Sequence, residues 1–111
     1  NTTGIYNSAF GRGALQSNSS GGANSAFGRM ALNYNTVGGN NTAVGFNCML
    51  ANVSGNNNAA FGYGALYNNT TNNNSAFGYK ALFANTIGPY NVAVGYNSLL
   101  SNNSGGYGKL V

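Results

Sequence analysis

The chain repeats itself about every 17 residues, and this period limits the possible fold more than any other property of the sequence. An Ala-Phe/Val-Gly tripeptide occurs six times, with spacings of 17, 17, 17, 16 and 17 residues. Its alanines are Ala9, Ala26, Ala43, Ala60, Ala76 and Ala93. Such a unit is too short for a helical-hairpin repeat of about 34 residues or for a four-stranded propeller blade. It fits one coil of a β-solenoid.

Other residues recur in the same register, so that stacked coils would align them in columns. The strand asparagine column, two residues before each tripeptide alanine, is Asn7, Asn24, Asn41, Asn58, Asn74 and Asn91. The turn asparagine column is Asn18, Asn35, Asn52, Asn69, Asn85 and Asn102. The leucine column is Leu15, Leu32, Met49, Leu66, Leu82 and Leu99. A turn glycine recurs at Gly4, Gly21, Gly38, Gly55, Gly88 and Gly105, with Asn72 as its expected substitute in the shortened unit. We expect the amides to form hydrogen-bond ladders rather than ligand sites, because unpaired buried amides are costly.

Each unit contains two short predicted strands, which are residues 8–12 and 14–17 in the first copy. Alternation along the first strand points Ala9 and Gly11 to one side and Phe10 to the other. Small residues suit the inside of a thin coil, and the leucine column would fill the rest of it. The larger residues then form an outward column, called here the outer strand column: Phe10, Phe27, Val44, Phe61, Phe77 and Val94. An exposed apolar stripe of this kind predicts a homo-oligomer.

The expected fold is therefore all-β, a parallel β-solenoid of about six 17-residue coils that packs as an oligomer through its outward apolar face. Residues 1–107 would form a single repeat domain, and residues 108–111 a terminal segment that leaves the repeat.

The composition argues against catalysis, because the chain has no Asp, Glu or His. It lacks the usual general acids, general bases and metal ligands, so we expect no enzyme activity, no metal and no cofactor. Cys48 stands in a column of small residues and is interpreted as a buried apolar residue. The net charge of +4 comes from four scattered basic residues, too few for a nucleic-acid surface. No run of about 18 apolar residues predicts a membrane span.

The column after each tripeptide, called here the cation–aromatic column, is Arg12, Arg29, Phe46, Tyr63, Tyr79 and Tyr96. The four aromatic residues could form a sugar-binding platform, but burial against a neighbouring chain is the favoured interpretation. The two arginines could contact anions or remain solvated. Possible N-glycosylation sequons begin at Asn1, Asn18, Asn40, Asn52, Asn68, Asn69, Asn73 and Asn102.

The segments NVAVGYNSL, residues 91–99, and NAAFGYGAL, residues 58–66, resemble the head repeats of trimeric autotransporter adhesins and related phage and bacterial tail-fibre repeats. The resemblance extends over nearly the whole chain up to residue 106. It implies a left-handed parallel β-roll, three chains packed through their apolar faces, and a role in surface attachment or in a rigid fibre.

The leading functional hypothesis is therefore an extracellular, cell-surface or virion tail-fibre protein, structural or adhesive, whose partners are copies of itself and possible host or matrix glycans. A self-polymerising fibril subunit, stacked head to tail or curli-like, is the alternative, because the sequence is rich in Asn and nearly uncharged. A carbohydrate- or ice-binding solenoid ranks lowest, since a flat Thr-x-Thr array is absent from the sequence.

Overall fold

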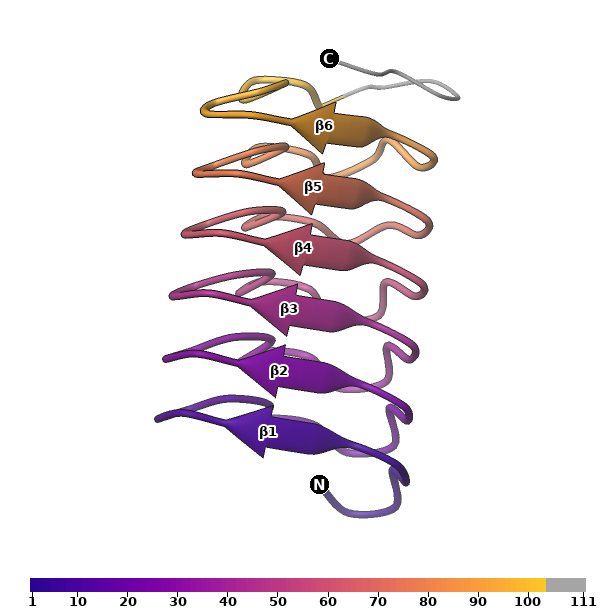
Figure 1. The fold of residues 1–111 in the computed structure, drawn as a ribbon. Coiled ribbons are helices and arrows are strands. Elements are labelled where there is room, and N and C mark those ends of the chain that lie inside the picture. Colours follow the sequence, from indigo (N-terminus) through magenta and orange to yellow (C-terminus); the bar gives the residue numbers. More distant parts are fainter. Residues whose placement is uncertain (104–111) are drawn as a thin grey trace.

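The computed structural model describes residues 1–103 as a parallel β-solenoid. Each repeat contributes one short strand. The strands are β1 (Ser8–Phe10), β2 (Ser25–Phe27), β3 (Thr42–Val44), β4 (Ala59–Phe61), β5 (Ser75–Phe77) and β6 (Val92–Val94). They form a single six-stranded sheet in sequence order, linked by five turns of the coil (Figure 1). The predicted all-β solenoid is confirmed. Residues 104–107 of the predicted repeat domain, with the turn glycine Gly105, and the terminal segment 108–111 lie outside the described residues.

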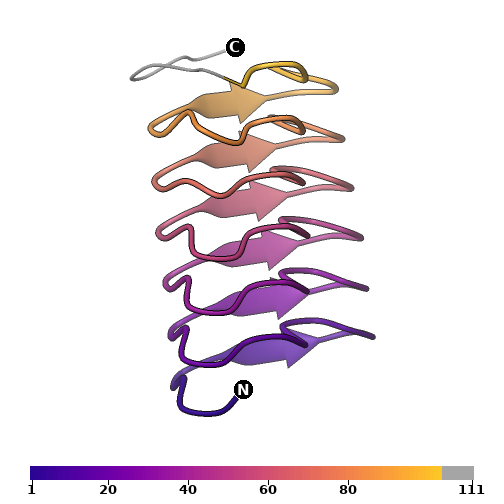
Figure 2. The same ribbon diagram turned by 180° about the vertical axis from the view of Figure 1, so that it is seen from behind.

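Neighbouring strands pair in the register that the repeat predicts. Ala9 lies beside Ala26 and Phe10 beside Phe27, and every later pair keeps this alignment, including the pair that spans the 16-residue unit. The strands run in one direction on one side of the stack, and the return segments run back on the other side (Figures 1 and 2). With the chain rising from its N-terminus, this winding is left-handed.

The second predicted strand, residues 14–17 in the first coil, is wrong, because this segment forms a turn. The leucine column at its centre has left-handed backbone, with φ between 50° and 52°. These residues still pair with the next coil, as where the Leu32 N–H donates to the Cys48 carbonyl at 3.0 Å. The first strand is also shorter than predicted, since the chain turns at Gly11, where φ is 123°.

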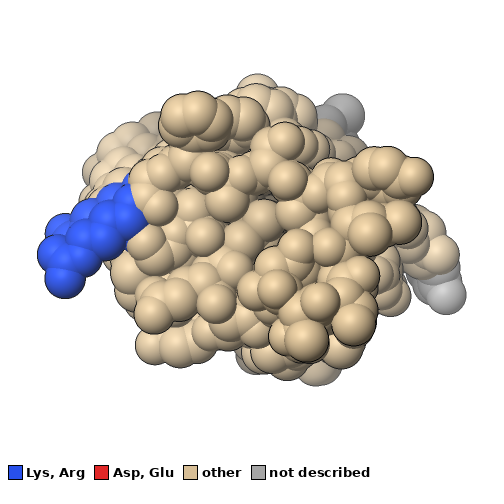
Figure 3. Space-filling model, turned by 90° about the horizontal axis from the view of Figure 1, so that it is seen from below, with Lys and Arg blue, Asp and Glu red and all other residues tan. Residues whose placement is uncertain are grey.

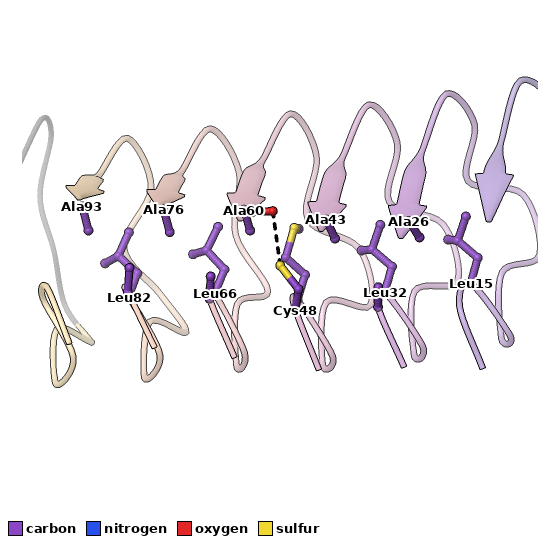
Figure 4. Close-up of a cluster of buried hydrophobic side chains, with 14 residues drawn as sticks. Leu15, Ala26, Leu32, Ala43, Cys48, Ala60, Leu66, Ala76, Leu82 and Ala93 are labelled. Carbon is purple, nitrogen blue, oxygen red and sulfur yellow. Dashed lines mark hydrogen bonds between the residues drawn. The ribbon is translucent and has the colours of Figure 1, made fainter. Parts of the chain in front are cut away.

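The leucine column reaches the interior by means of this unusual backbone. Leu32, Met49, Leu66 and Leu82 are fully buried against the strand alanines, as predicted (Figure 4). A left-handed φ costs a non-glycine residue about 1–2 kcal/mol. Burying a leucine or methionine side chain contributes about 1.5–3 kcal/mol. Burial therefore outweighs the local strain. The backbone propensity of leucine alone does not predict this conformation.

The turn glycine is needed because successive coils approach very closely at this position. A Cβ atom on Gly38 would lie 2.4 Å from the carbonyl oxygen of Gly55 in the next coil. In the short unit the structure places Thr71 here, because the Asn69 amide donates to the Thr71 carbonyl at 2.8 Å. The prediction that Asn72 replaces the glycine is wrong. Asn72 lies one position later, where its Oδ1 accepts from the Asn56 N–H.

Candidate functional site

The strand asparagine column joins every coil to the next, as the ladder prediction requires. The Oδ1 atom of Asn41 accepts the backbone N–H of Asn58 at 3.0 Å, and this bond recurs from Asn7 up to Asn91. The Asn41 side-chain amide also donates to the Gly55 carbonyl at 2.8 Å. Asn24, Asn41, Asn74 and Asn91 are fully buried, so their amides act as internal crosslinks.

The turn asparagine column forms a second ladder through its side chains alone. The Nδ2 atom of Asn35 donates to Oδ1 of Asn18 at 2.8 Å, and the same contact recurs up the column. The two ladders meet at the turn glycine, because Gly38 O accepts from both Asn24 Nδ2 and Asn35 Nδ2. Both amide columns are therefore occupied in holding the coils together and offer little to a ligand.

The outer strand column lies on the solvent side of the sheet. Its exposed fractions are 71% for Phe10, 40% for Phe27, 39% for Phe77 and 58% for Val94. Phe10 stacks on Phe27 with ring centroids 5.8 Å apart, and Phe61 on Phe77 at 5.1 Å. Val44 lies between the two stacked pairs, and Val94 follows the second pair. A continuous apolar stripe therefore extends along the sheet.

The cation–aromatic column forms a second ladder beside the first, immediately after the glycine at which the chain leaves the sheet. The rings of Phe46, Tyr63, Tyr79 and Tyr96 stack with centroids 5.1–5.3 Å apart. Arg29 continues the stack, with its Cζ atom 5.3 Å from the Phe46 ring centroid. In the view from the N-terminal end, the basic side chain that is visible projects sideways from the stack (Figure 3).

The stacking geometry disfavours the sugar platform. A sugar would pack against an exposed ring face, whereas in this ladder each face between neighbouring coils is covered by the next ring. The exposed ring edges are better suited to packing against another apolar surface. Of the two arginines considered for anion binding, Arg29 lies against an aromatic ring, and Arg12 is exposed in the first coil.

One aromatic cluster is missed by sequence reasoning. Tyr67 stacks on Phe83 at 4.7 Å, and Lys80 Nζ lies 5.3 Å from the Tyr79 ring and 5.4 Å from the Phe83 ring. Its column varies in character, with Gln16 and Asn33 in the same position of the first coils. A search for residues that recur in every repeat cannot find such a pair, but the spacing of 16 residues between two aromatics could have indicated it.

A column of hydroxyl groups also escaped the sequence analysis. Ser19, Thr36 and Thr70 each donate their hydroxyl to a backbone carbonyl of the next coil, at 3.0, 3.3 and 2.8 Å. The sequence does contain a signal for this column, because a Thr or Ser directly follows the turn asparagine in most repeats. Because these hydroxyls are already bonded to backbone, the column does not favour an ice-binding array.

The asparagines of the candidate sequons differ in how deeply they are buried. Asn18, Asn52 and Asn69 are buried members of the turn asparagine ladder, where a glycan would have no room. Asn102 is half-buried at the upper end of the same column. Asn1 and Asn40 are exposed, and Asn68 and Asn73 are half-buried. Glycosylation of the folded chain is therefore expected at the exposed positions.

Cys48, the single cysteine of the sequence, lies fully buried in the column otherwise occupied by alanines and Ser98. Its thiol donates to the Ala60 carbonyl at 3.3 Å (Figure 4). Burial raises the pKa of the Cys48 thiol to about 12, partly opposed by a backbone hydrogen bond from Val44. The thiol is therefore neutral at physiological pH.

This burial predicts how stability depends on pH. The folded-state pKa of Cys48 lies above the unfolded value, so the folded state retains a proton that the unfolded state loses, and stability falls from about pH 9 upward. The slope approaches about 1.4 kcal/mol per pH unit once the unfolded thiol is fully ionised, so the loss between pH 9 and 11 is about 2 kcal/mol. Urea unfolding of the parent and of Cys48→Ala checks this, because the alanine variant should lose distinctly less. Parallel losses in the two proteins would contradict it.

Residues 1–103 enclose no pocket, and they contain no group of three or more His, Cys, Asp or Glu residues that could hold a metal ion. No helix in this part of the chain has the length and apolar character of a membrane span. Comparisons with protein-family models, with curated proteins and with solved structures found no match. The surface columns and internal ladders are therefore the features on which a functional argument can rest.

Proposed function

We propose that this chain is a structural and adhesive segment of an extracellular fibre, and that it acts through stiffness and repetition rather than through catalysis. The observation that supports this most is the continuity of its ladders. Backbone pairing, two asparagine columns and the leucine column all connect each coil to the next. In such a stack each repeat is stabilised mainly by its neighbours, and bending must disturb several ladders together.

The surface supports the same proposal. The chain carries four basic side chains and no acidic ones, and two apolar ladders extend along the stack. We expect copies of the chain to associate through the outer strand column. Repetition of the same surface along a fibre would then convert weak contacts into durable attachment by avidity.

Single-molecule stretching tests the mechanical part of this proposal. Pulling the chain from its two ends should give high resistance, followed by release of whole coils. Each coil of 17 residues should add about 55–60 Å of contour length, at about 3.4 Å per residue. Yielding at low force without regular steps would contradict a role in resisting tension. The adhesive part is checked by the force needed to detach chain-coated beads from glycan-coated and bare surfaces, where detachment equal to that of uncoated beads would oppose it.

The fibril alternative rests on the same apolar stripe and on the near absence of charge. Electron microscopy over a range of concentrations separates the two proposals. Discrete particles that keep their length favour a fibre segment of fixed size, whereas filaments that lengthen with concentration favour a self-polymerising subunit.

A further inference from the structure

Two pairs of tyrosine rings stack directly on each other within the cation–aromatic column. Tyr63 lies on Tyr79 with ring centroids 5.2 Å apart and an interplanar angle of 11°, and Tyr79 lies on Tyr96 at 5.1 Å and 8°. The main chain fixes this spacing. The Tyr63 carbonyl accepts from the Lys80 N–H at 2.8 Å, and the Tyr79 carbonyl accepts from the Asn97 N–H at the same distance. The three phenols are therefore held next to one another by the coils that carry them.

The edges of these rings are open to solvent, although neighbouring rings cover the faces between coils. Tyr63, Tyr79 and Tyr96 are 41%, 39% and 75% exposed. An oxidant can therefore reach the phenols from outside, and water can take up the proton that an oxidised phenol releases. The Lys80 ammonium lies 5.3 Å from the Tyr79 ring centroid, and its positive charge favours a neutral phenoxyl radical over a radical cation.

We propose that the stacked tyrosines are a site of oxidative crosslinking, at which two adjacent rings of one chain are joined as dityrosine. The oxidant is a peroxide acting through a haem peroxidase. Each of two neighbouring phenols gives one electron to the peroxidase and its hydroxyl proton to water. The two radicals couple through a new bond between ring carbons ortho to the hydroxyl groups, and the two ortho hydrogens then move to the oxygens. The tyrosine pair has lost two hydrogen atoms, and the peroxide has become two molecules of water.

The ladder favours this reaction because the second ring is already in place when the first is oxidised. The rings are nearly parallel and occupy equivalent positions, so matching carbon atoms lie about one centroid spacing apart. Coupling requires the two rings to turn edge to edge, a rotation about side-chain torsions that their exposed edges leave room for. Two radicals on one chain also meet at the effective concentration of a tethered pair, whereas radicals on separate chains must diffuse together.

Two tyrosines outside the column show which feature makes the site. Tyr34 is 51% exposed, but the residues at its position in the adjacent coils are Ser17 and Ala51. Tyr67 stacks on Phe83, which has no phenol to oxidise. Exposure or stacking alone is therefore insufficient, and the site requires two phenols at the same position of successive coils.

The product would join successive coils covalently. A link from Tyr79 to Tyr63 or to Tyr96 connects residues 16 or 17 positions apart in the sequence. Such a link restricts the unfolded chain much as a disulfide does. The chain has a single cysteine and cannot form an intrachain disulfide, so the tyrosine pairs offer it a different covalent crosslink.

Treatment of the dilute chain with a haem peroxidase and hydrogen peroxide tests the site. Mass spectrometry after digestion should find linked peptides that join Tyr79 to Tyr63 or to Tyr96, each lighter by two hydrogens than its two parts together. Tyr79→Phe removes the member shared by both pairs and should lower intrachain dityrosine, measured by its fluorescence in the monomer fraction, about tenfold or more. The ring stack should persist, because Phe46 already occupies this column.

Two matched variants separate the position of the tyrosines from their number. Tyr34→Phe also removes one exposed tyrosine and should leave intrachain dityrosine unchanged. Phe46→Tyr combined with Tyr79→Phe has as many tyrosines as the parent. It places a new phenol beside Tyr63, on which Phe46 stacks at 5.3 Å, and should restore the crosslink. Circular dichroism before oxidation identifies any variant that fails to fold.

Equal intrachain dityrosine in folded Tyr79→Phe and the parent would overturn the proposal. Linked peptides of the parent that come mainly from tyrosines outside the column, or from crosslinks between chains, would overturn it without reference to any variant. Both rings belong to one chain, so the site does not depend on the proposed fibre, and these results would leave the mechanical and adhesive tests of that fibre unaffected.

Discussion

Gly45→Ala is expected to remove at least about 4 kcal/mol of stability or to prevent folding altogether. Gly45 has a φ of 136°, a conformation that costs a side-chain-bearing residue about 1–3 kcal/mol. A Cβ atom there would also lie 2.6 Å from the carbonyl oxygen of Gly62, which belongs to the backbone of the next coil and cannot move alone. Two penalties therefore add, in a domain whose total stability is typically about 5–15 kcal/mol. Urea unfolding followed by circular dichroism measures the loss.

Gly95→Ala is the matched control for this prediction. Gly95 has a similar φ of 123°, but no described atom lies within 4 Å of the position its Cβ would take. The Gly95→Ala variant should therefore pay the conformational cost without the collision, and its stability should fall by about 1–3 kcal/mol. Equal losses at Gly45 and Gly95 would mean that successive coils are not in close contact at this turn.

Asn41→Asp is expected to make the stability of the protein strongly dependent on pH. The Asn41 side chain accepts from the Asn58 N–H and donates to the Gly55 carbonyl, and it is fully buried. A protonated aspartic acid can make both contacts, whereas the carboxylate places an acceptor against Gly55 O and a charge in the interior. Desolvation and this contact should raise the pKa of the new carboxyl above its usual value of about 3.9.

The sign follows from the proton bound in the folded state. Stability is retained below about pH 4 and lost as the pH rises, at up to about 1.4 kcal/mol per unit, so that pH 7 should cost about 3–4 kcal/mol more than pH 4. The measurement is urea unfolding from pH 3 to 8. The parent has no Asp, Glu or His and should change little between pH 4 and 7.

Two variants control for other effects of this substitution. Asn41→Ala removes the same contacts without adding a titrating group, so it should lose stability equally at both pH values. Asn68→Asp changes a half-buried asparagine whose side chain makes no hydrogen bond among the described residues, and it should be nearly neutral. A flat pH profile for Asn41→Asp would show that the strand asparagine column is open to water.

The repeat was sufficient to predict the coil length, the register and the direction in which most side chains point. Strict recurrence of the tripeptide fixed which residues stack, and strand alternation separated the buried alanines from the exposed Phe10 and Phe27. The asparagine ladders could be predicted because a buried amide needs partners, and a repeated amide finds them in the adjacent coil.

The errors arose where closing a short coil overrides local preference. Leu66 takes a φ of 51°, which a leucine rarely adopts in isolation. It does so because a thin coil must reverse direction within a few residues and still point this side chain inward. No single-residue propensity contains that requirement. The placement of Thr71 at the turn depended likewise on which residue the 16-residue unit omits, and the sequence alone leaves two alignments open.

The surface function was the least predictable part. Which rings stack follows from the period, but the contact of Lys80 with Tyr79 and Phe83 depends on side chains from columns that are not uniform. Whether an exposed aromatic column binds sugar or protein depends on whether its faces or its edges are free. That distinction requires the stacking geometry.

Distances between spin labels test the stacked solenoid most directly. In a Cys48→Ala background, Ser17→Cys would be paired in turn with Asn68→Cys, Ala84→Cys and Ser101→Cys, which lie at equivalent positions three, four and five coils away. We expect the mean distance, measured by electron–electron double resonance in magnetically diluted samples, to rise by about 4.8 Å at each step. Distances that grow with the square root of sequence separation, or that fail to rise in equal steps, would contradict it.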